Sequence, residues 1–130
     1  MANTILAVDD EAHAREFVST ILEEHGYIAI LAEDGEEAME IIRQNKPDLV
    51  ILDILMPKQS GIRMYRELKT SESLRDIPVI ICSGIARRTL LRGQVALTET
   101  SGESVPDPDA YLEKPVTSTC LVSTIKRILG

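Results

Sequence analysis

The chain has 130 residues, the size of one domain, and its 44% hydrophobic and 27% charged residues are typical of a globular protein rather than a disordered one. The net charge of −7 argues against direct nucleic-acid binding, because proteins that bind nucleic acid usually carry a basic face. The N-terminus has no basic stretch and no long apolar run, so we expect no signal peptide, no membrane anchor and a cytoplasmic location.

Apolar runs of strand length alternate with segments of helical period from the start of the chain. Thr4–Val8 is a nearly all-apolar run that predicts a strand ending at Asp9 and Asp10. From Glu11 the apolar spacing becomes helical, and Gly26 stands where a glycine commonly ends a helix. The residues expected to share the buried face of this helix are Phe17, Val18, Ile21 and Leu22.

The next segment repeats the pattern. Tyr27–Ala32 predicts a second strand, and Asp34-Gly35 predicts a turn that leads into a second helix. Lys46-Pro47 ends this helix, because proline cannot continue it. Its expected apolar face consists of Ala38, Met39, Ile41 and Ile42.

Two continuous runs of Leu, Val and Ile predict the third and fourth strands. They are Asp48–Leu52 and Pro78–Cys82, and such runs are typical of parallel strands that are covered on both faces. Between them, a helix is expected over roughly Gly61–Lys69, with Ser60 as its cap.

The last third of the chain is less regular. A helix is expected over Arg87–Leu97, followed by a polar stretch, Thr98–Asp109, and a short strand, Ala110–Leu112. The final helix is expected over Ser118–Leu129. Its inward residues would be Leu121, Val122, Ile125, Ile128 and Leu129.

Five strands in alternation with five helices predict an α/β fold with a doubly wound, five-stranded parallel sheet. The chain shows no internal repeat and no long linker, so we expect a single domain over residues 1–130 without an output domain. In such a sheet, ligands bind beyond the carboxyl ends of the strands.

The two cysteines, Cys82 and Cys120, lie within apolar stretches. They form no close pair and show no spacing typical of a metal site. We therefore expect two buried free thiols.

Polar residues stand at the ends of four predicted strands. Asp9 and Asp10 follow the first strand, Asp53 the third and Ser83 the fourth, and Lys114 follows the fifth. Each has a plain structural explanation: Asp10 could cap a helix, Asp53 and Ser83 could form turns, and Lys114 could be a solvated surface charge. Their occurrence together at one edge of the sheet favours a functional site.

This set of groups has a specific chemistry. Three neighbouring carboxylates repel one another unless a cation is present, and oxygen-only ligands suit Mg²⁺. Such an ion can bridge to a phosphoryl oxygen, with Lys114 as a second positive charge and Ser83 as a hydrogen-bond donor. The carboxylate nearest the open position would be the nucleophile and form an aspartyl phosphate.

Over essentially its whole length the chain resembles the CheY-like receiver domain of two-component response regulators. The resemblance implies a flavodoxin-like receiver fold, with Asp53 as the phosphoacceptor for a sensor histidine kinase or a histidine phosphotransfer protein. The motifs that carry it are Asp9-Asp10 after the first strand, Asp53 in Asp-Ile-Leu-Met-Pro, Ser83 after Val-Ile-Ile-Cys, and Lys114-Pro115.

The resemblance also implies roles for the surrounding residues. Lys114 would contact Asp53 before transfer and the phosphoryl group after it, and the Lys114–Pro115 peptide bond would be cis. The ligands implied for Mg²⁺ are the carboxylates of Asp10 and Asp53, the backbone carbonyl of Leu55 and, through a water, Asp9.

A phosphoryl group would add up to about two negative charges beside Ser83. In the family, this hydroxyl moves to meet the group and an aromatic residue on the fifth strand turns inward. Tyr111 matches that aromatic, and a tyrosine that simply packs at a strand edge is the alternative. The readout surface would be helix four, strand five and helix five.

Leu55 and Ile85 lie two residues beyond Asp53 and Ser83, where the family sets the rate of hydrolysis. Both are aliphatic and cannot hydrogen-bond an attacking water. We therefore expect a long-lived phosphorylated state.

The segment from Ser83 to Lys114 is longer than the family norm, and the surplus falls in the acidic stretch Thr98–Asp109. This stretch is either a tolerated surface insertion or an element specific to one partner. It also leaves open whether the protein is a monomer or forms a phosphorylation-linked homodimer.

Two other functions compete with phosphorylation-driven signalling. A degenerate receiver would act as a phosphorylation-independent interaction module, but every residue of the chemical set is present. An enzyme of the same fold is disfavoured, because a flavin site needs a Ser/Thr/Gly-rich loop where this chain has Asp9-Asp10-Glu11, and the related phosphatases need an Asp at Leu55. We expect at most slow self-phosphorylation and self-dephosphorylation, and a downstream protein target that the sequence does not identify.

Overall fold

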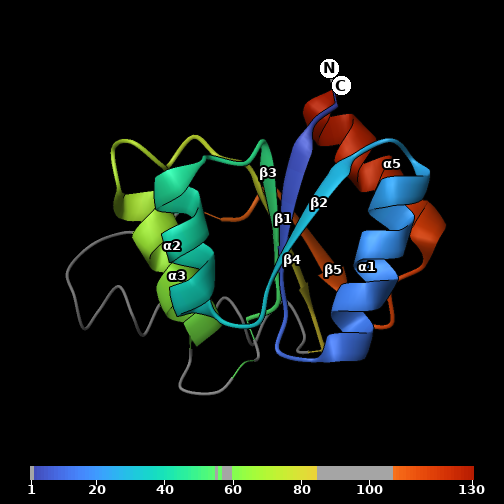
Figure 1. Ribbon diagram of the computed structural model, residues 1–130, viewed down its shortest axis with the longest axis horizontal. Coiled ribbons are helices and arrows are strands. Elements are labelled where there is room, and N and C mark those ends of the chain that lie inside the picture. The colour runs from blue at the N-terminus through green and yellow to red at the C-terminus, as the bar shows by residue number, and fades with distance from the viewer. Residues whose placement is uncertain (1, 55, 57–59, 85–106) are drawn as a thin grey trace.

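The computed structural model describes residues 2–54, 56, 60–84 and 107–130 (Figure 1). Helices and strands alternate through most of these ranges. In chain order they are β1 (Thr4–Val8), α1 (Ala12–Glu24), β2 (Ile28–Ala32), α2 (Gly35–Gln44), β3 (Leu49–Leu52), α3 (Ser60–Thr70), β4 (Val79–Ser83), β5 (Ala110–Glu113) and α5 (Ser118–Leu129).

The strands form one sheet in the order β2-β1-β3-β4-β5, and every neighbouring pair is parallel. In Figure 1, α1 and α5 lie on one face of the sheet and α2 and α3 on the other. The predicted doubly wound, five-stranded parallel sheet is therefore confirmed. Four of the five predicted helices are present, and the one expected over Arg87–Leu97 lies outside the described residues.

The continuous apolar strands are buried because helices cover both faces of the sheet. In β1, Leu6 and Val8 pack into the cluster on the α2 and α3 face. Ile5 and Ala7, which alternate with them, pack into the cluster on the α1 and α5 face. The sheet is thus the buried centre of the fold, and the strand ends project from it.

Local signals set the ends of two helices. Gly26 has a φ of 83°, a left-handed conformation that glycine adopts without a steric penalty, and it follows α1 as predicted. Asp34 does more than form a turn, because its side chain accepts a 2.8 Å hydrogen bond from the Glu37 amide and caps α2.

One residue expected on the buried face of α1 is exposed. Ile21 and Leu22 are buried, but the Phe17 residue is 48% exposed, so that prediction was wrong for Phe17. At about 100° per residue, Phe17 lies roughly 90° from the direction midway between Ile21 and Leu22. The face of α1 that packs against the sheet is therefore narrower than the arc of apolar side chains on the helix.

The two cysteines differ in their burial. Cys82 lies in β4 and is buried as expected, whereas Cys120 is exposed, so the prediction of two buried thiols was wrong for Cys120. Cys120 lies in the first turn of α5, whose buried residues include Leu121, Val122 and Ile125. Cys120 directly precedes the buried residues of α5, so its side chain is exposed although its neighbours are apolar.

Strand boundaries shift by one residue relative to the sequence prediction, which is ordinary for element ends. One shift matters for the site, because Ser83 is the last residue of β4 rather than the residue after it.

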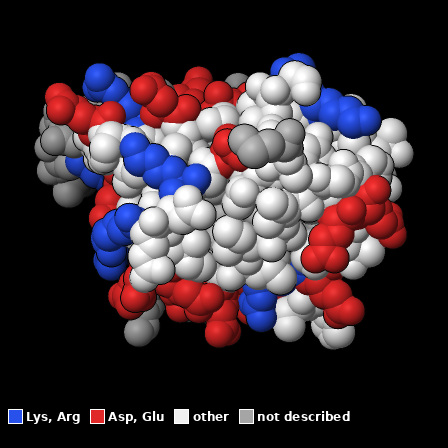
Figure 2. All heavy atoms as spheres, turned by 45° about the horizontal axis from the view of Figure 1, so that its top comes forward, with Lys and Arg blue, Asp and Glu red and all other residues white. Residues whose placement is uncertain are grey.

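In the described part of the chain, none of the helices is long and apolar enough to cross a membrane. Among the described residues on the face shown in Figure 2, Lys and Arg are scattered among acidic residues and form no single basic patch.

Candidate functional site

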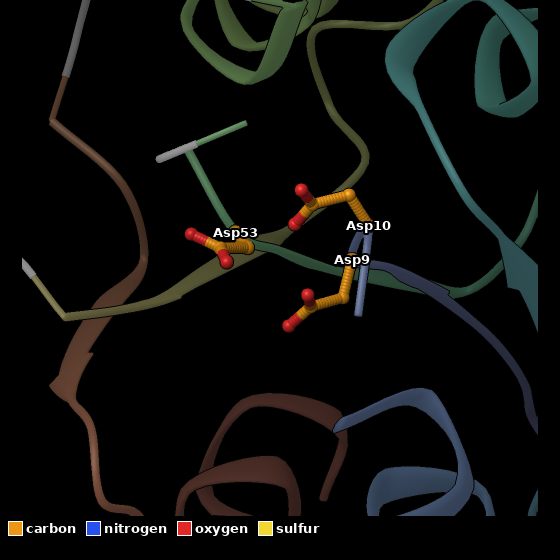
Figure 3. Close-up of side chains that lie close together, drawn as sticks. All are labelled: Asp9, Asp10 and Asp53. Carbon is orange, nitrogen blue, oxygen red and sulfur yellow. The ribbon is translucent and has the colours of Figure 1, made fainter. Parts of the chain in front are cut away.

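Three aspartates meet at the carboxyl ends of two neighbouring strands. Asp9 follows β1 and Asp53 follows β3, and β1 pairs with β3 through Val8 and Leu52. The Asp53 amide donates a 3.0 Å hydrogen bond to the Val8 carbonyl, which continues the ladder to the site. One carboxylate oxygen from each of Asp9, Asp10 and Asp53 lies within 4.8 Å of the other two, and Figure 3 shows the three side chains projecting to the same side.

Asp9 is held through both its backbone and its side chain. Its amide donates to the Ala32 carbonyl at 3.1 Å, and its Oδ1 accepts from the Glu11 amide at 3.0 Å. Glu11 occupies the N-cap position of α1 without a side-chain hydrogen bond, so the alternative that Asp10 caps this helix was wrong. Asp10 is instead exposed beside two buried aspartates.

Lys114 joins the aspartates from the loop after β5. Its Nζ lies 2.7 Å from Asp9 Oδ2 and 3.1 Å from Asp53 Oδ2. Its amide donates to the Ser83 carbonyl at 2.8 Å, which anchors the loop to the end of β4. With a side chain only 28% exposed and held between two carboxylates, Lys114 is not a solvated surface charge.

The electrostatics of Lys114 follow from these contacts. Burial alone would lower the pKa of the amine, but the hydrogen bond to Asp9 and the charge of Asp53 act in the opposite direction and raise it above its usual value. The amine therefore stays protonated. It offsets part of the repulsion among the three carboxylates.

Ser83 stands at the end of β4 with its side chain fully buried. Its Oγ has no hydrogen-bond partner among the described residues. A buried hydroxyl without a partner costs about 1–3 kcal/mol, so such groups are rare unless a function uses them. A ligand arriving at the site could supply the missing partner.

Two further expectations fall on and after β5. Tyr111 is partly buried and packs against the cluster on the α2 and α3 face. Burial and then the charges of Glu113 and Asp53 raise the pKa of its phenol, so the ring lies within electrostatic reach of Asp53. The Lys114–Pro115 peptide bond is cis, as the family resemblance implied.

Several residues named from the sequence lie outside the described residues. They are Leu55, Ile85, the helix expected over Arg87–Leu97, and residues 98–106 of the acidic stretch. Their roles stay predictions.

The structure also adds a residue that the sequence did not suggest. Arg15 of α1 donates from Nη1 to the carbonyl oxygen of Asp9 at 2.8 Å. Its position one helical turn after Glu11 could have suggested a contact with the strand end, because long helical side chains point back toward the N-terminus.

The donor set fits a hard divalent cation. The three clustered side chains offer oxygen atoms alone, which suits Mg²⁺ or Ca²⁺ and disfavours ions that prefer nitrogen or sulfur. Two buried carboxylates and an exposed one leave room for waters, which Mg²⁺ usually retains.

Comparison with known proteins agrees with this arrangement. The response regulator receiver domain family matches residues 5–126. The chain is 36% identical over 129 residues to the phosphate regulon transcriptional regulatory protein PhoB of Escherichia coli. The aligned residues make up 99% of this chain but 52% of that protein. The chain therefore spans about half the length of that relative.

A second relative matches nearly end to end. The polar-differentiation response regulator DivK of Brucella ovis is 31% identical over 130 residues, which cover 100% of this chain and 98% of that one. Among solved structures, the chemotaxis response regulator CheY4 of Vibrio cholerae superposes with a TM-score of 0.82 at 24% identity, covering 99% of this chain and 100% of that one. The structural match supports the flavodoxin-like, CheY-like fold.

Proposed function

Because the chain belongs to the response regulator receiver domain family, we propose that Asp53 accepts a phosphoryl group and that this modification is its signal. The donor would be a phosphohistidine on a sensor histidine kinase or a histidine phosphotransfer protein. Receiver domains act as phosphoacceptor signalling domains rather than as ordinary enzymes, so turnover would be limited to slow self-phosphorylation and self-dephosphorylation.

One observation carries the proposal: the Lys114 amine lies between the carboxylates of Asp9 and Asp53. In the transfer, an Asp53 oxygen attacks phosphorus, and the bond from phosphorus to the donor histidine nitrogen breaks with its electron pair left on that nitrogen. Lys114 is within reach to exchange its contact with Asp53 for one with a phosphoryl oxygen. Its fixed positive charge would stabilise the charge that develops there.

Mg²⁺ is the cofactor that the site residues would hold. Asp10 and Asp53 would bind it directly, with Asp9 acting through a water and the Leu55 carbonyl as a further ligand. When bound, the ion neutralises negative charge on the phosphoryl oxygens. The oxygen-only donor set supports this assignment.

Ser83 and Tyr111 would convert the modification into a change of surface. The Ser83 hydroxyl, which lacks a partner among the described residues, would donate to a phosphoryl oxygen. Tyr111, which lies on the neighbouring strand, would then turn inward. The surface altered would be helix four, β5 and α5, and its target a downstream protein.

The proposal of a long-lived signal rests on Leu55 and Ile85. Leu55→Asn would supply an amide that can orient an attacking water, so we expect the aspartyl phosphate of this variant to decay faster than that of the wild type. Decay is followed by intact mass after removal of the donor. An unchanged decay rate would contradict this role for Leu55.

The phosphoacceptor itself is tested by intact mass after incubation with a small phosphoryl donor, with and without Mg²⁺. We expect a Mg²⁺-dependent gain of one phosphoryl group in the wild type and none in Asp53→Asn. Glu113→Gln is a matched control, because this exposed carboxyl lies near the site but outside the cluster.

The same experiment tests the second candidate, a receiver that acts without phosphorylation. A wild type that gains no phosphoryl group at any Mg²⁺ concentration would favour it over the main proposal. A cytoplasmic location remains a prediction.

A further inference from the structure

The Arg15 contact lies at a particular peptide group. The carbonyl of Asp9 and the amide of Asp10 belong to one planar unit, from whose two sides the Asp9 and Asp10 side chains project. Arg15 Nη1 donates to that carbonyl oxygen at 2.8 Å. The guanidinium therefore restrains the rotation of the peptide plane between the two aspartates.

The rest of Asp9 is already fixed by other groups. Its amide is bonded to Ala32, and its carboxylate oxygens are bonded to the Glu11 amide and to Lys114. Asp10 is exposed and has no such restraint in the described hydrogen bonds. The direction of the Asp10 carboxylate thus depends on the peptide plane that Arg15 holds.

Charge neutralisation is not what Arg15 contributes. Three carboxylates lie nearby, yet within the described ranges Arg15 forms no ion pair with any of them and donates to a neutral carbonyl instead. Arg15 is itself anchored at the start of α1, where its amide donates to the Glu11 carbonyl at 3.1 Å. A planar, always-charged guanidinium on a helix is a well-defined donor.

We propose that Arg15 is a positioning residue of this site: by fixing the peptide plane between Asp9 and Asp10, it directs the Asp10 carboxylate toward the bound divalent cation. The inference rests on the proposed function, since it assumes that these aspartates bind Mg²⁺. Outer residues that orient metal ligands commonly change metal affinity by about 10- to 100-fold.

Direct binding of Mg²⁺ to the unphosphorylated protein tests the inference. By calorimetric titration we expect the Mg²⁺ dissociation constant of Arg15→Gln to rise about tenfold. Loss of a positive charge alone would have the opposite effect, because it makes the site more negative and tightens cation binding. The direction of the change thus separates positioning from charge.

Two variants serve as controls. Arg63→Gln makes the same charge change at a residue that lines the groove bordering Asp10, and it is expected to bind Mg²⁺ as tightly as the wild type or more tightly. Arg15→Lys keeps the charge but not the reach of the guanidinium, so its dissociation constant should lie between those of wild type and Arg15→Gln. If Arg15→Gln fails to fold, Arg15→Lys decides the question, and a wild-type constant in it overturns the proposal.

A second readout separates positioning from general stability. Phosphorylation of Arg15→Gln by a small donor should need more Mg²⁺ for half-maximal rate yet approach the wild-type rate at saturating Mg²⁺. Unchanged or tighter Mg²⁺ binding in Arg15→Gln, or equal weakening in Arg63→Gln, would overturn the role of Arg15 alone. Absence of Mg²⁺ binding by the wild type would overturn the proposed metal site and this inference with it.

Discussion

Lys114 lies at the carboxyl ends of the strands and Lys69 at their amino ends, and the two amines have different hydrogen-bond partners. Lys114, after the carboxyl end of β5, contacts two carboxylate oxygens at 2.7 and 3.1 Å. Lys69, at the C-terminal end of α3, donates to the backbone carbonyls of Arg75 and Ile77 at 3.2 and 2.9 Å. A carboxylate oxygen of Asp109, just before β5, lies 3.8 Å from the Lys69 amine.

The pKa values of the two amines move in opposite directions as a result. Burial dominates at Lys69, whose side chain is only 7% exposed, and lowers its pKa despite the charge of Asp109. At Lys114 the two carboxylates outweigh burial and raise the pKa. Carboxylate partners thus keep the Lys114 amine charged, whereas the Lys69 amine, bonded to two carbonyls, joins the end of α3 to the segment before β4.

The largest effect is expected from removal of the charge at the carboxyl edge. Lys114→Met should slow phosphorylation by a small donor about 100-fold, because a fixed charge beside the transferring group is lost. Initial rates from intact mass measure this, with Lys126→Met on the exposed face of α5 as the matched control. A rate within a few-fold of wild type would remove Lys114 from the proposed mechanism.

Removal of the amine at the opposite edge should affect stability instead. Lys69→Met leaves two carbonyls without their donor and should lower the free energy of unfolding by about 2–3 kcal/mol. The phosphorylation rate of the folded protein should stay at the wild-type value. Urea unfolding measures the loss.

Lys46→Met is a matched control for Lys69→Met, because Lys46 also donates to a carbonyl, that of Ser73 at 2.7 Å, but in an exposed position. It should cost less than about 1 kcal/mol. Equal losses in the two variants would mean that burial does not distinguish these lysines.

A smaller effect is expected in the pH dependence of stability. The pKa of Lys69 is lowered from 10.5, so the unfolded chain binds more protons there, and the stability difference between wild type and Lys69→Met should grow as the pH rises toward 10.5. The pKa of Lys114 is raised from 10.5, so its contribution should be constant below that pH and be lost above it. Urea unfolding of both variants across this range checks the slopes, and slopes of the same sign would contradict the contrast.

The smallest effect concerns Ser83 at the carboxyl edge. Because its buried Oγ has no partner in the described structure, Ser83→Ala should leave the unphosphorylated protein as stable as the wild type or more stable by up to about 1 kcal/mol. Thr124→Val is the control, since the Thr124 hydroxyl donates to the Cys120 carbonyl at 2.8 Å and its loss should cost about 1 kcal/mol. A clear destabilisation by Ser83→Ala would indicate that the hydroxyl is satisfied before phosphorylation.

Much of the fold and the site could be predicted from the sequence. The apolar runs predicted all five strands within one residue at each end, because strands buried on both faces must be continuously apolar. Parallel strands place their carboxyl ends at one edge, so Asp9, Asp53 and Lys114 were expected together, and their contacts confirm it.

Other features depended on where each helix touches the sheet. Phe17 and Cys120 follow the apolar pattern yet are exposed, because the buried faces of α1 and α5 are narrower than their apolar arcs. From the sequence, Lys69 was only the last residue of an expected helix. In the structure its buried amine donates to the Ile77 carbonyl in the segment before β4.

The sequence by itself determined which chemical groups stand at which strand ends, since strand order along the chain and hydrophobic period are local properties. Only the tertiary structure decided how those groups are partnered. Lys114 lies closer to Asp9, 105 residues away, than to Asp53, and Arg15 holds the peptide group between Asp9 and Asp10. Such partners are chosen by the packing of segments distant in the chain, which no local pattern records.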